Sequence, residues 1–377
     1  MKNRQKPAIR FKGFTEDWEQ RKLGEVFKYE QPLAYIVENT DYDGKNDIPV
    51  LTAGQSFILG YTDENFGIKE ASEKNPVIIF DDFTTSSHYV DFPFKVKSSA
   101  MKLLNLNNQK DNIYCAYNVL KSISYLPVSH ERHWISTFAK FDILLPRNAD
   151  EQKQVGQYFS LIDHLITLHQ RKYDKLVNVK KSMLEKMFPC DGKIVPDIRF
   201  SGFTEDWEQR KVREIADRYD NLRVPVAASI RIPGTTPYYG ANGIQDYVEG
   251  YTHEGEFVLV AEDGANDLIN YPVKCVNGRI WVNNHAHVIQ GKDIIANNQF
   301  LAYSINHADI ENLLVGGSRA KLNAETLMDI ELTIPSVIEQ QEIGSYLKSL
   351  DHLIALHQRK LEKLKNIKKS CLEKMFI

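Results

Sequence analysis

The sequence has few of the features that usually reveal chemistry or a compartment. Its four cysteines, at positions 115, 190, 275 and 371, stand singly without a CxxC pair. This predicts reduced thiols in the cytoplasm, and it argues against a disulfide framework or a cysteine-bound zinc. No run of 18 apolar residues occurs, so we expect no membrane span. Neither a GxxxxGK[ST] phosphate loop nor a GxGxxG turn after a strand is present, which leaves ATP and S-adenosylmethionine without an obvious binding site.

Two histidine-containing segments do not match a metal site. HERHW (130–134) places its histidines three residues apart, whereas the zinc-binding helix HExxH places them four apart on one face. NNHAH (283–287) would put His285 and His287 on one face of an expected strand, where a surface or core role is favoured over metal binding. We therefore predict no metal in this chain.

The sequence does contain a repeated frame. Residues 7–22 read PAIRFKGFTEDWEQRK and residues 196–211 read PDIRFSGFTEDWEQRK, so 14 of 16 positions match. Residues 151–188 and 339–376 agree at 24 of 38 positions. The period, near 188 residues, is far longer than the ~20–50 residues of a solenoid repeat. The chain is therefore one unit duplicated, and each copy has a head, a middle and a tail.

The two tails predict long helices that pair as a coiled coil. Apolar residues recur every seven positions in each tail, and a helix with such a stripe must bury it against a partner. We expect the tails to pair with each other, antiparallel and with an internal pseudo-two-fold, as in a symmetric dimer fused into one chain. Two histidines on the stripe are interpreted as polar positions that fix the register. The residues expected at this seam are Val155, Ile162, His169, Leu176, Met183, Ile343, Leu350, His357 and Leu364.

The two middles have equal length but different amino-acid sequences, and their patterns indicate mixed α/β structure. NPVIIFDD (75–82) and EFVLVAED (256–263) are β-rich, and FDILLP and IELTIP are typical of closing strands before a proline. Between the two copies, the sequences of the heads and tails are kept, while those of the middles differ. This favours a scaffold that holds two readers of different targets over a duplicated enzyme. Trp18 and Trp207, in the heads, are expected to pack each head against the helices.

The doubled head PxIRFxGFxxxW and the doubled tail EQ…DHLI…LHQRK…LEKMF resemble the specificity subunit of type I restriction–modification systems over essentially the whole chain. The resemblance implies a mixed α/β fold with two divergent target-recognition domains, separated by two long antiparallel coiled-coil helices. The implied division is 1–150 for the first head and domain and 151–188 for the central helix. Residues 189–338 then form the second head and domain, and 339–377 the C-terminal helix.

The resemblance also implies a function. This would be a non-catalytic subunit in which each domain reads one half of a bipartite site in double-stranded DNA. The helices would set the spacer between the halves and dock two methyltransferase subunits, which restriction subunits would join. S-adenosylmethionine, ATP and Mg²⁺ are expected in those partners, with no cofactor in this chain. A coiled-coil scaffold that displays two protein-binding domains, without DNA, is the alternative.

The charge departs from that of a typical DNA-binding chain. The formal net charge is −3, whereas contact with phosphates needs Lys and Arg. Each tail carries a net +3, which leaves about −9 for the rest. We therefore expect local basic loops in the middles, with further phosphate contacts from partner subunits.

Two pairs of loops at equivalent positions are candidates for contact with DNA. One pair precedes the closing strands (127–134 and 316–323), and the other follows the β-rich segments (81–89 and 262–267). Arg and Lys suit guanine and Asn suits adenine, although a solvated turn is the alternative for each loop. The predicted base contacts in these loops are Thr84, Thr85, Ser86, His88, Arg132, His133, Asn266, Arg319, Lys321 and Asn323, and the turn-rich segment YYGANG (238–243) adds Tyr239 and Asn242. Lys95 and Lys97 are predicted phosphate contacts.

Overall fold

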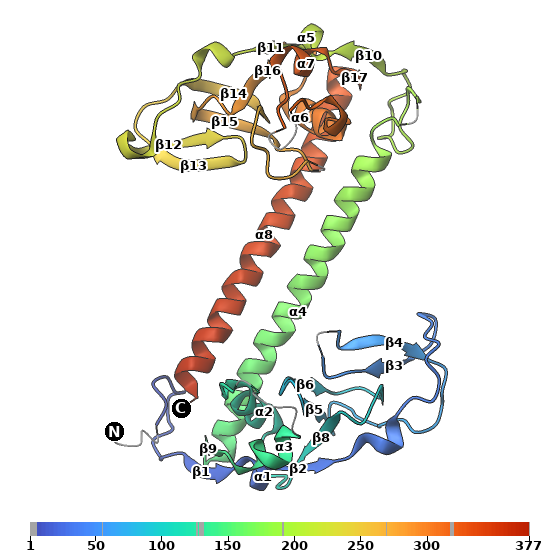
Figure 1. Ribbon diagram of the computed structural model, residues 1–377, viewed down its shortest axis with the longest axis vertical. Helices are drawn as coiled ribbons and strands as arrows, with labels where there is room; N and C mark the ends of the chain where they lie inside the picture. Colours follow the sequence, from blue (N-terminus) through green and yellow to red (C-terminus); the bar gives the residue numbers. More distant parts are fainter. Residues whose placement is uncertain are drawn as a thin grey trace. The chain divides into compact units, whose positions relative to one another are not determined.

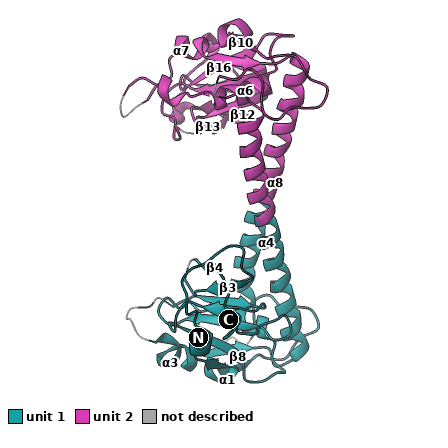
Figure 2. Cartoon of the chain, turned by 90° about the vertical axis from the view of Figure 1, so that its right-hand side faces the viewer, with its two compact units in different colours: residues 1–170, 359–377 teal, residues 171–358 magenta. Residues whose placement is uncertain are grey.

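The chain forms two compact units. The computed structural model describes residues 6–54, 56–125, 127, 132–190, 192–268, 270–316 and 320–376. Unit 1 comprises residues 1–170 and 359–377, and unit 2 comprises residues 171–358 (Figure 2). Two long helices, α4 (Ala149–Lys186) and α8 (Val337–Met375), each begin in one unit and end in the other (Figure 1). The predicted mixed α/β fold with two domains and two long helices is confirmed.

Each repeated head ends in a strand that pairs with the strand leading into a long helix. In unit 1, β1 (Glu19–Lys22) pairs antiparallel with β9 (Asp142–Leu145). In unit 2, β10 (Glu208–Lys211) pairs in the same way with β17 (Glu331–Ile334). Because β9 and β17 directly precede α4 and α8, the head fastens the end of each mixed domain at the point where its helix begins.

The mixed domain of unit 1 contains two sheets. One has the strand order β2-β8-β5-β6 and the other the order β4-β3-β7. The strands are β2 (Phe27–Glu30), β3 (Ile48–Leu51), β4 (Ile58–Thr62), β5 (Val77–Asp81), β6 (Ser87–Val90), β7 (Lys95–Val96) and β8 (Met101–Leu106). The helices are α1 (Leu23–Val26), α2 (Ile113–Ser122) and α3 (His133–Ser136), with 3-10 turns at Pro32–Tyr35 and Phe138–Lys140.

The mixed domain of unit 2 contains one six-stranded sheet with the order β11-β16-β14-β15-β12-β13. The strands are β11 (Ala216–Arg218), β12 (Pro233–Gly240), β13 (Gly243–Val248), β14 (His253–Ala261), β15 (Val273–Val282) and β16 (Ala286–Gly291). The helices are α5 (Val212–Ile215), α6 (Asn298–His307) and α7 (Ala324–Asp329), with 3-10 turns at Asp220–Leu222, Ala228–Ile230 and Glu311–Leu313.

The difference between one sheet and two has a local cause. Strand β15 pairs antiparallel with β14 and then, at Trp281 and Val282, parallel with β12. In unit 1 the same two partnerships are divided between β6, which pairs with β5, and β7, which pairs with β3. Pro93 lies between β6 and β7. Proline lacks the N–H that a strand interior needs, so the strand is interrupted and the sheet becomes two.

A buried ion pair joins each head to its helix. Glu151 of α4 is 1% exposed and accepts two hydrogen bonds from Arg10, at 2.6 and 2.8 Å. Glu339 of α8 is likewise buried and accepts the same two bonds from Arg199, at 2.6 and 2.7 Å. Trp18 adds a third bond to Glu151, at 3.3 Å. A two-point guanidinium–carboxylate pair fixes orientation as well as contact.

The residues after each glutamate hold the mixed domain against its helix. Gln152 accepts a hydrogen bond from the N–H of Asn112, the N-cap of α2, at 2.8 Å. Gln340 accepts the equivalent bond from Asn297, the N-cap of α6, at 2.9 Å. A Cβ atom at Gly156 would lie 2.1 Å from Asn112 Oδ1, so glycine is needed for this close approach. These contacts explain why both tails begin EQxxxG.

Each unit has a core to which head, mixed domain and both helix ends contribute. In unit 1, Trp18 and Phe80 share a buried cluster with Phe159 of α4 and Phe376 beyond α8. In unit 2, Trp207 packs edge-on against Phe188, just beyond the end of α4, with ring centroids 6.4 Å apart. Burial of a large apolar side chain contributes about 1.5–3 kcal/mol. The two tryptophans therefore pack the heads against the helix ends, as predicted.

The two long helices run antiparallel within each unit. In unit 1, Asp163 of α4 accepts hydrogen bonds from Lys368 of α8 and from Tyr114 of α2, the latter at 2.7 Å. In unit 2, Lys180 of α4 contacts Asp351 of α8 at 2.6 Å. Of the expected seam residues, those that are buried are Val155, Ile162, Ile343 and Leu350, and those that are partly buried are His169, Leu176, Met183, His357 and Leu364.

Candidate DNA-recognition surface

Three loops of unit 1 meet at one end of its mixed domain. They are the β3–β4 hairpin (52–57), the β5–β6 turn (82–86) and the segment that ends at α3. The Ser86 hydroxyl donates a hydrogen bond to the carbonyl of Ala53, which joins the turn to the hairpin. The N–H of His133 donates to the carbonyl of Asp82 at 3.1 Å, which joins the third segment to the turn.

Unit 2 brings together the equivalent three loops. The side chain of Asn242, in the β12–β13 turn, donates to the carbonyl of Gly264 at 2.9 Å and accepts from the N–H of Asn266 at 2.9 Å. The N–H of Leu322, before α7, donates to the carbonyl of Glu262 at 2.8 Å. We call each set of three loops the recognition loops of its unit.

The β5–β6 turn of unit 1 is held by its own backbone. Asp81 Oδ1 accepts hydrogen bonds from the N–H groups of Phe83 at 2.7 Å and Thr84 at 3.0 Å. Thr85 adopts a φ of 59°, a left-handed conformation that is uncommon for a threonine. Thr84 is exposed, and Thr85 and Ser86 are partly exposed. This turn therefore presents hydroxyl groups from a fixed backbone.

The other predicted residues of unit 1 differ in exposure. Arg132 is exposed at the N-cap of α3. His88 is partly buried and stacks on Phe57 of the hairpin, with ring centroids 4.3 Å apart, and burial lowers its pKa. Lys97 is partly exposed, with Nζ 5.7 Å from the ring centroid of Tyr42.

Two predictions for unit 1 are not supported, because the side chains are buried. Lys95 is 0% exposed, pairs with Glu64 and donates to the carbonyl of Phe66 at 2.9 Å. Both faces of the short strand β7 are covered, so this lysine points into the domain. His133 is also 0% exposed and lies 3.4 Å from the hydroxyl of Tyr125. Neither side chain is available to DNA in this structure.

Among the predicted residues of unit 2, Asn242, Asn266 and Asn323 are exposed. Tyr239 is only 6% exposed and packs in the core around β14 and β15, so its predicted contact with DNA is not supported. Burial raises the pKa of this tyrosine. Arg319 lies outside the described residues.

Lys321 is positioned at the surface by an ion pair with Glu262. Its Nζ lies 2.8 Å from Glu262 Oε1, and the lysine side chain is 44% exposed. Glu262 also accepts a hydrogen bond from Arg223 at 2.6 Å. Burial opposes ionisation of Glu262, but the bonds from Lys321 and Arg223 outweigh it and lower the pKa of this carboxyl. Lys321 is thereby kept charged and oriented at the edge of the recognition loops.

The β3–β4 hairpin of unit 1 was not predicted from the sequence. Its counterpart in unit 2 stands out in the sequence as the turn-rich YYGANG, whereas TAGQSF (52–57) carries a weaker turn pattern. Thr52 closes the hairpin by donating to the carbonyl of Ser56 at 2.9 Å. The tripeptide GYT ends β4 in unit 1 and comes just after β13 in unit 2, and it is the signal that could have located the first hairpin.

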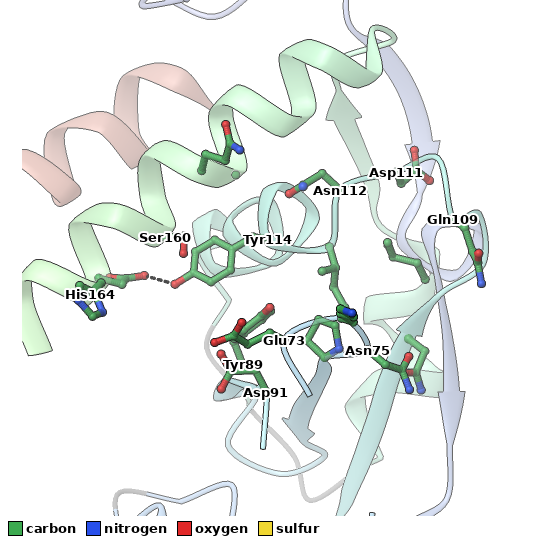
Figure 3. A pocket seen from close by; sticks show the side chains of 18 of the residues that line it. Glu73, Asn75, Tyr89, Asp91, Gln109, Asp111, Asn112, Tyr114, Ser160 and His164 are labelled. Carbon is green, nitrogen blue, oxygen red and sulfur yellow. Dashed lines mark hydrogen bonds between the residues drawn. The ribbon is translucent and has the colours of Figure 1, made fainter. Parts of the chain in front are cut away.

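A broad pocket of about 1230 Å³ lies elsewhere in unit 1, between the mixed domain and α4 (Figure 3). Tyr114 and Asp163, both in its lining, are joined by a hydrogen bond. Its lining carries five carboxylates and three lysines: Glu30, Glu73, Asp91, Asp111 and Asp163 against Lys28, Lys69 and Lys74. An excess of negative charge disfavours DNA phosphates, so we do not assign this pocket to DNA.

The described residues hold neither a cluster suited to a metal ion nor a helix suited to a bilayer. In those residues no group of three or more His, Cys, Asp or Glu side chains is arranged to hold a metal ion. None of the helices in the described part of the chain is both long and apolar enough to cross a bilayer.

Two mixed α/β domains with equivalent loop sets, each fastened by the same contacts to a pair of long helices, define a duplicated recognition protein. The family model of the type I restriction modification DNA specificity domain matches the chain twice, at residues 15–178 and 204–366. The chain therefore belongs to this family of type I specificity subunits. The alternative of a scaffold without a DNA target is not favoured.

Individual relatives agree with this assignment. The chain is 30% identical over 370 residues to the specificity subunit of the type I restriction enzyme EcoR124I/EcoR124II from Escherichia coli, covering 88% of this chain and 86% of that relative. It is 48% identical over 149 residues to a putative type I specificity subunit from Haemophilus influenzae, covering 40% of this chain and 38% of that relative. The crystal structure of the type I S subunit from M. genitalium has the same fold, with a TM-score of 0.77, 15% identity and 99% of both chains covered.

Proposed function

We propose that this chain is the DNA-recognition subunit of a type I restriction–modification complex, and that each unit reads one half of a bipartite site. The observation that carries the proposal is that one repeated frame holds two chemically different sets of recognition loops. The frame keeps the same ion pairs and helix contacts in both copies, so the difference is confined to the loops.

The exposed groups of the two loop sets suit different bases. Unit 1 presents the hydroxyl of Thr84 and the guanidinium of Arg132, and unit 2 presents the amides of Asn242 and Asn266 and the ammonium of Lys321. Arg and Lys pair with the O6 and N7 acceptors of guanine, and Asn with the N6 and N7 of adenine. Two half-sites of different sequence follow from this difference.

The remaining parts of the proposal concern assembly. The division into a first recognition domain (1–150), a central helix (151–188), a second recognition domain (189–338) and a C-terminal helix (339–377) is supported by the start of α4 at Ala149 and of α8 at Val337. The two helices set the spacer and dock two methyltransferase subunits, with restriction subunits joining them. S-adenosylmethionine, ATP and Mg²⁺ act in those partners, and this chain is the non-catalytic reader.

The test is the methylome of cells that express this chain with its methyltransferase partner. The expected result is adenine methylation at one split sequence with a fixed unspecified gap. The chain alone should neither methylate nor cleave DNA. Methylation by the purified pair without a bipartite consensus would overturn the proposal.

A further inference from the structure

A cleft in unit 1 carries an excess of positive charge outside the recognition loops. It has a volume of about 400 Å³ and lies between the end of α2 and the last third of α8. Its charged lining residues are Lys121, Lys365, Lys368, Lys369 and Glu373. The lining thus contains four ammonium groups and a single carboxylate.

One of the four lysines is already neutralised. Lys368 donates a hydrogen bond to Asp163 of α4, as its counterpart Lys180 contacts Asp351 in unit 2. This lysine therefore belongs to the pairing of the two helices. Lys121, Lys365 and Lys369 are exposed, as is Ser122 beside them. They are the groups available to a ligand.

Gathering these charges opposes folding. Lys365 and Lys369 lie four residues apart on one face of α8, a spacing at which like charges repel. Lys121 is exposed as a whole residue, but the protein atoms around its ammonium group and the charge of Lys368 lower its pKa, and Asp163 only partly offsets this. A bound anion would relieve the repulsion.

Part of the cleft is specific to the first copy, whereas Lys368 and Lys369 have counterparts in Lys180 and Lys181 of the second. The tail alignment places Val177 where Lys365 stands, and Asn306 follows the N-cap of α6 by the same nine residues that separate Lys121 from the N-cap of α2. Asn306 donates to the carbonyl of Tyr271 at 2.8 Å and so has a structural role. The duplicated frame therefore does not account for Lys121 and Lys365.

The position of the cleft indicates which anion it meets. Lys121 and Ser122 end α2, and the chain leads from them through residues 123–132 to Arg132, a member of the recognition loops. Tyr125, three residues beyond Ser122, already lies 3.4 Å from His133 at the start of α3. The cleft and Arg132 of the recognition loops are thus ten residues apart in the sequence.

We propose that the cleft formed by Lys121, Lys365 and Lys369 binds backbone phosphates of duplex DNA beside the half-site read by unit 1. This inference rests on the proposed function. The contact carries no sequence information and adds affinity, in place of the phosphate contact that buried Lys95 cannot make. It places local positive charge beside the recognition loops in a chain whose net charge is −3.

The test uses the complex of this chain with its methyltransferase. The variant K365Q/K369Q removes two charges, while glutamine keeps the helix propensity of lysine. The matched control is K360Q/K374Q, because both of these lysines are exposed on α8 outside the cleft. The dissociation constant is measured against salt concentration. Each lost phosphate contact reduces the slope of log K against log salt by about 0.9, so we expect a reduction of about 2 for the cleft variant. The control slope should stay that of the wild type.

Affinity for specific and for random duplex should fall by the same factor, and the methylation consensus should be unchanged. Replacing phosphates beside the first half-site by uncharged methylphosphonates should weaken the binding of DNA to the wild type. The same replacement should not weaken the binding of DNA to K365Q/K369Q. Equal slopes for cleft variant and control would overturn the inference. Loss of the methyltransferase from the cleft variant, with its salt slope intact, would assign the cleft to an acidic protein surface and also overturn it. Failure of the wild-type complex to discriminate its target would instead refute the proposed function.

Discussion

Arg10 and Glu151 lie 141 residues apart in the chain and form a two-point ion pair at 2.6 and 2.8 Å. Arg199 and Glu339 reproduce it in the second copy at 2.6 and 2.7 Å. Each pair joins a repeated head to the start of a repeated tail. The two heads resemble each other, and so do the two tails, because each head must contact its own tail. The mixed domains between them are not bound by this contact and are free to change.

Arg10→Ala should destabilise unit 1 by roughly 3–5 kcal/mol, because Glu151 would be left as an unpaired buried charge. Urea unfolding of the full chain, followed by tryptophan fluorescence, measures the change. Lys193→Ala is the control, since its ion pair with Asp197 is exposed and exposed pairs contribute little. A loss for Arg10→Ala no larger than that of the control would contradict the role given to the pair.

Glu64 should make unit 1 sensitive to acid. Burial opposes its ionisation, yet hydrogen bonds from Lys95 and from the N–H groups of Asn39 and Glu38 lower its pKa below the ordinary 4.5. A lowered folded-state pKa gives stability that is present above pH 4.5 and lost as the pH falls through the folded value. Glu64→Gln should therefore reduce stability at pH 7 and flatten its decline towards acid. Unfolding free energies measured from pH 7 down to pH 3 test this, and an equally steep decline in the variant would refute it.

The two mixed domains should be separable readers. Replacing residues 23–145 by the corresponding region of a relative should change one half-site and leave the other intact, because each domain is fastened to the frame by its own contacts. Methylome sequencing of cells with the chimera reports both halves at once. A chimera that alters the two halves together would remove the two-reader proposal.

Lys321→Ala should weaken specific binding by roughly 1–3 kcal/mol if the side chain contacts a base edge. Discrimination should then relax at one position of the half-site read by unit 2. Lys211→Ala is the control, since this lysine lies on β10, outside the recognition loops, with its side chain 44% exposed and paired with Asp329 at 3.3 Å. An equal loss on all sequences would mark Lys321 as a phosphate contact, and no loss would favour a solvated turn.

The frame was predictable from the sequence, and much of the surface was not. Repeats and heptads are local patterns, so the two domains and the long helices could be read directly. The burial of Lys95 depends on Glu64, 31 residues away, and that of Tyr239 depends on the strands of one particular sheet. Such long-range contacts leave no periodic pattern in the chain. Lysines, histidines and tyrosines in a variable region therefore resemble surface residues until the fold is known.

The two helices are expected to act as a ruler for the gap between half-sites, and their register determines how to lengthen them. In unit 2, Lys180 contacts Asp351 and the helices are antiparallel. The junction between Lys175 and Leu176 in α4 therefore lies opposite the junction between Ala355 and Leu356 in α8. Inserting four residues at both junctions lengthens each helix by about 6 Å and adds about one turn. The apolar stripes then stay nearly aligned, and no recognition loop is touched.

Both half-site sequences should persist in this double insertion, while the unspecified spacer grows by one or two base pairs, since 6 Å is close to two steps of about 3.4 Å along the duplex. The DNA also rotates by roughly one tenth of a turn per added base pair, so affinity should fall somewhat as the units adjust. Insertion into α4 alone is the contrast, because it puts α4 out of register with α8 and should cost stability instead of shifting the spacer cleanly. The methylome of cells with the double insertion is the decisive measurement. Retained methylation with an unchanged spacer would show that the helices do not set the gap.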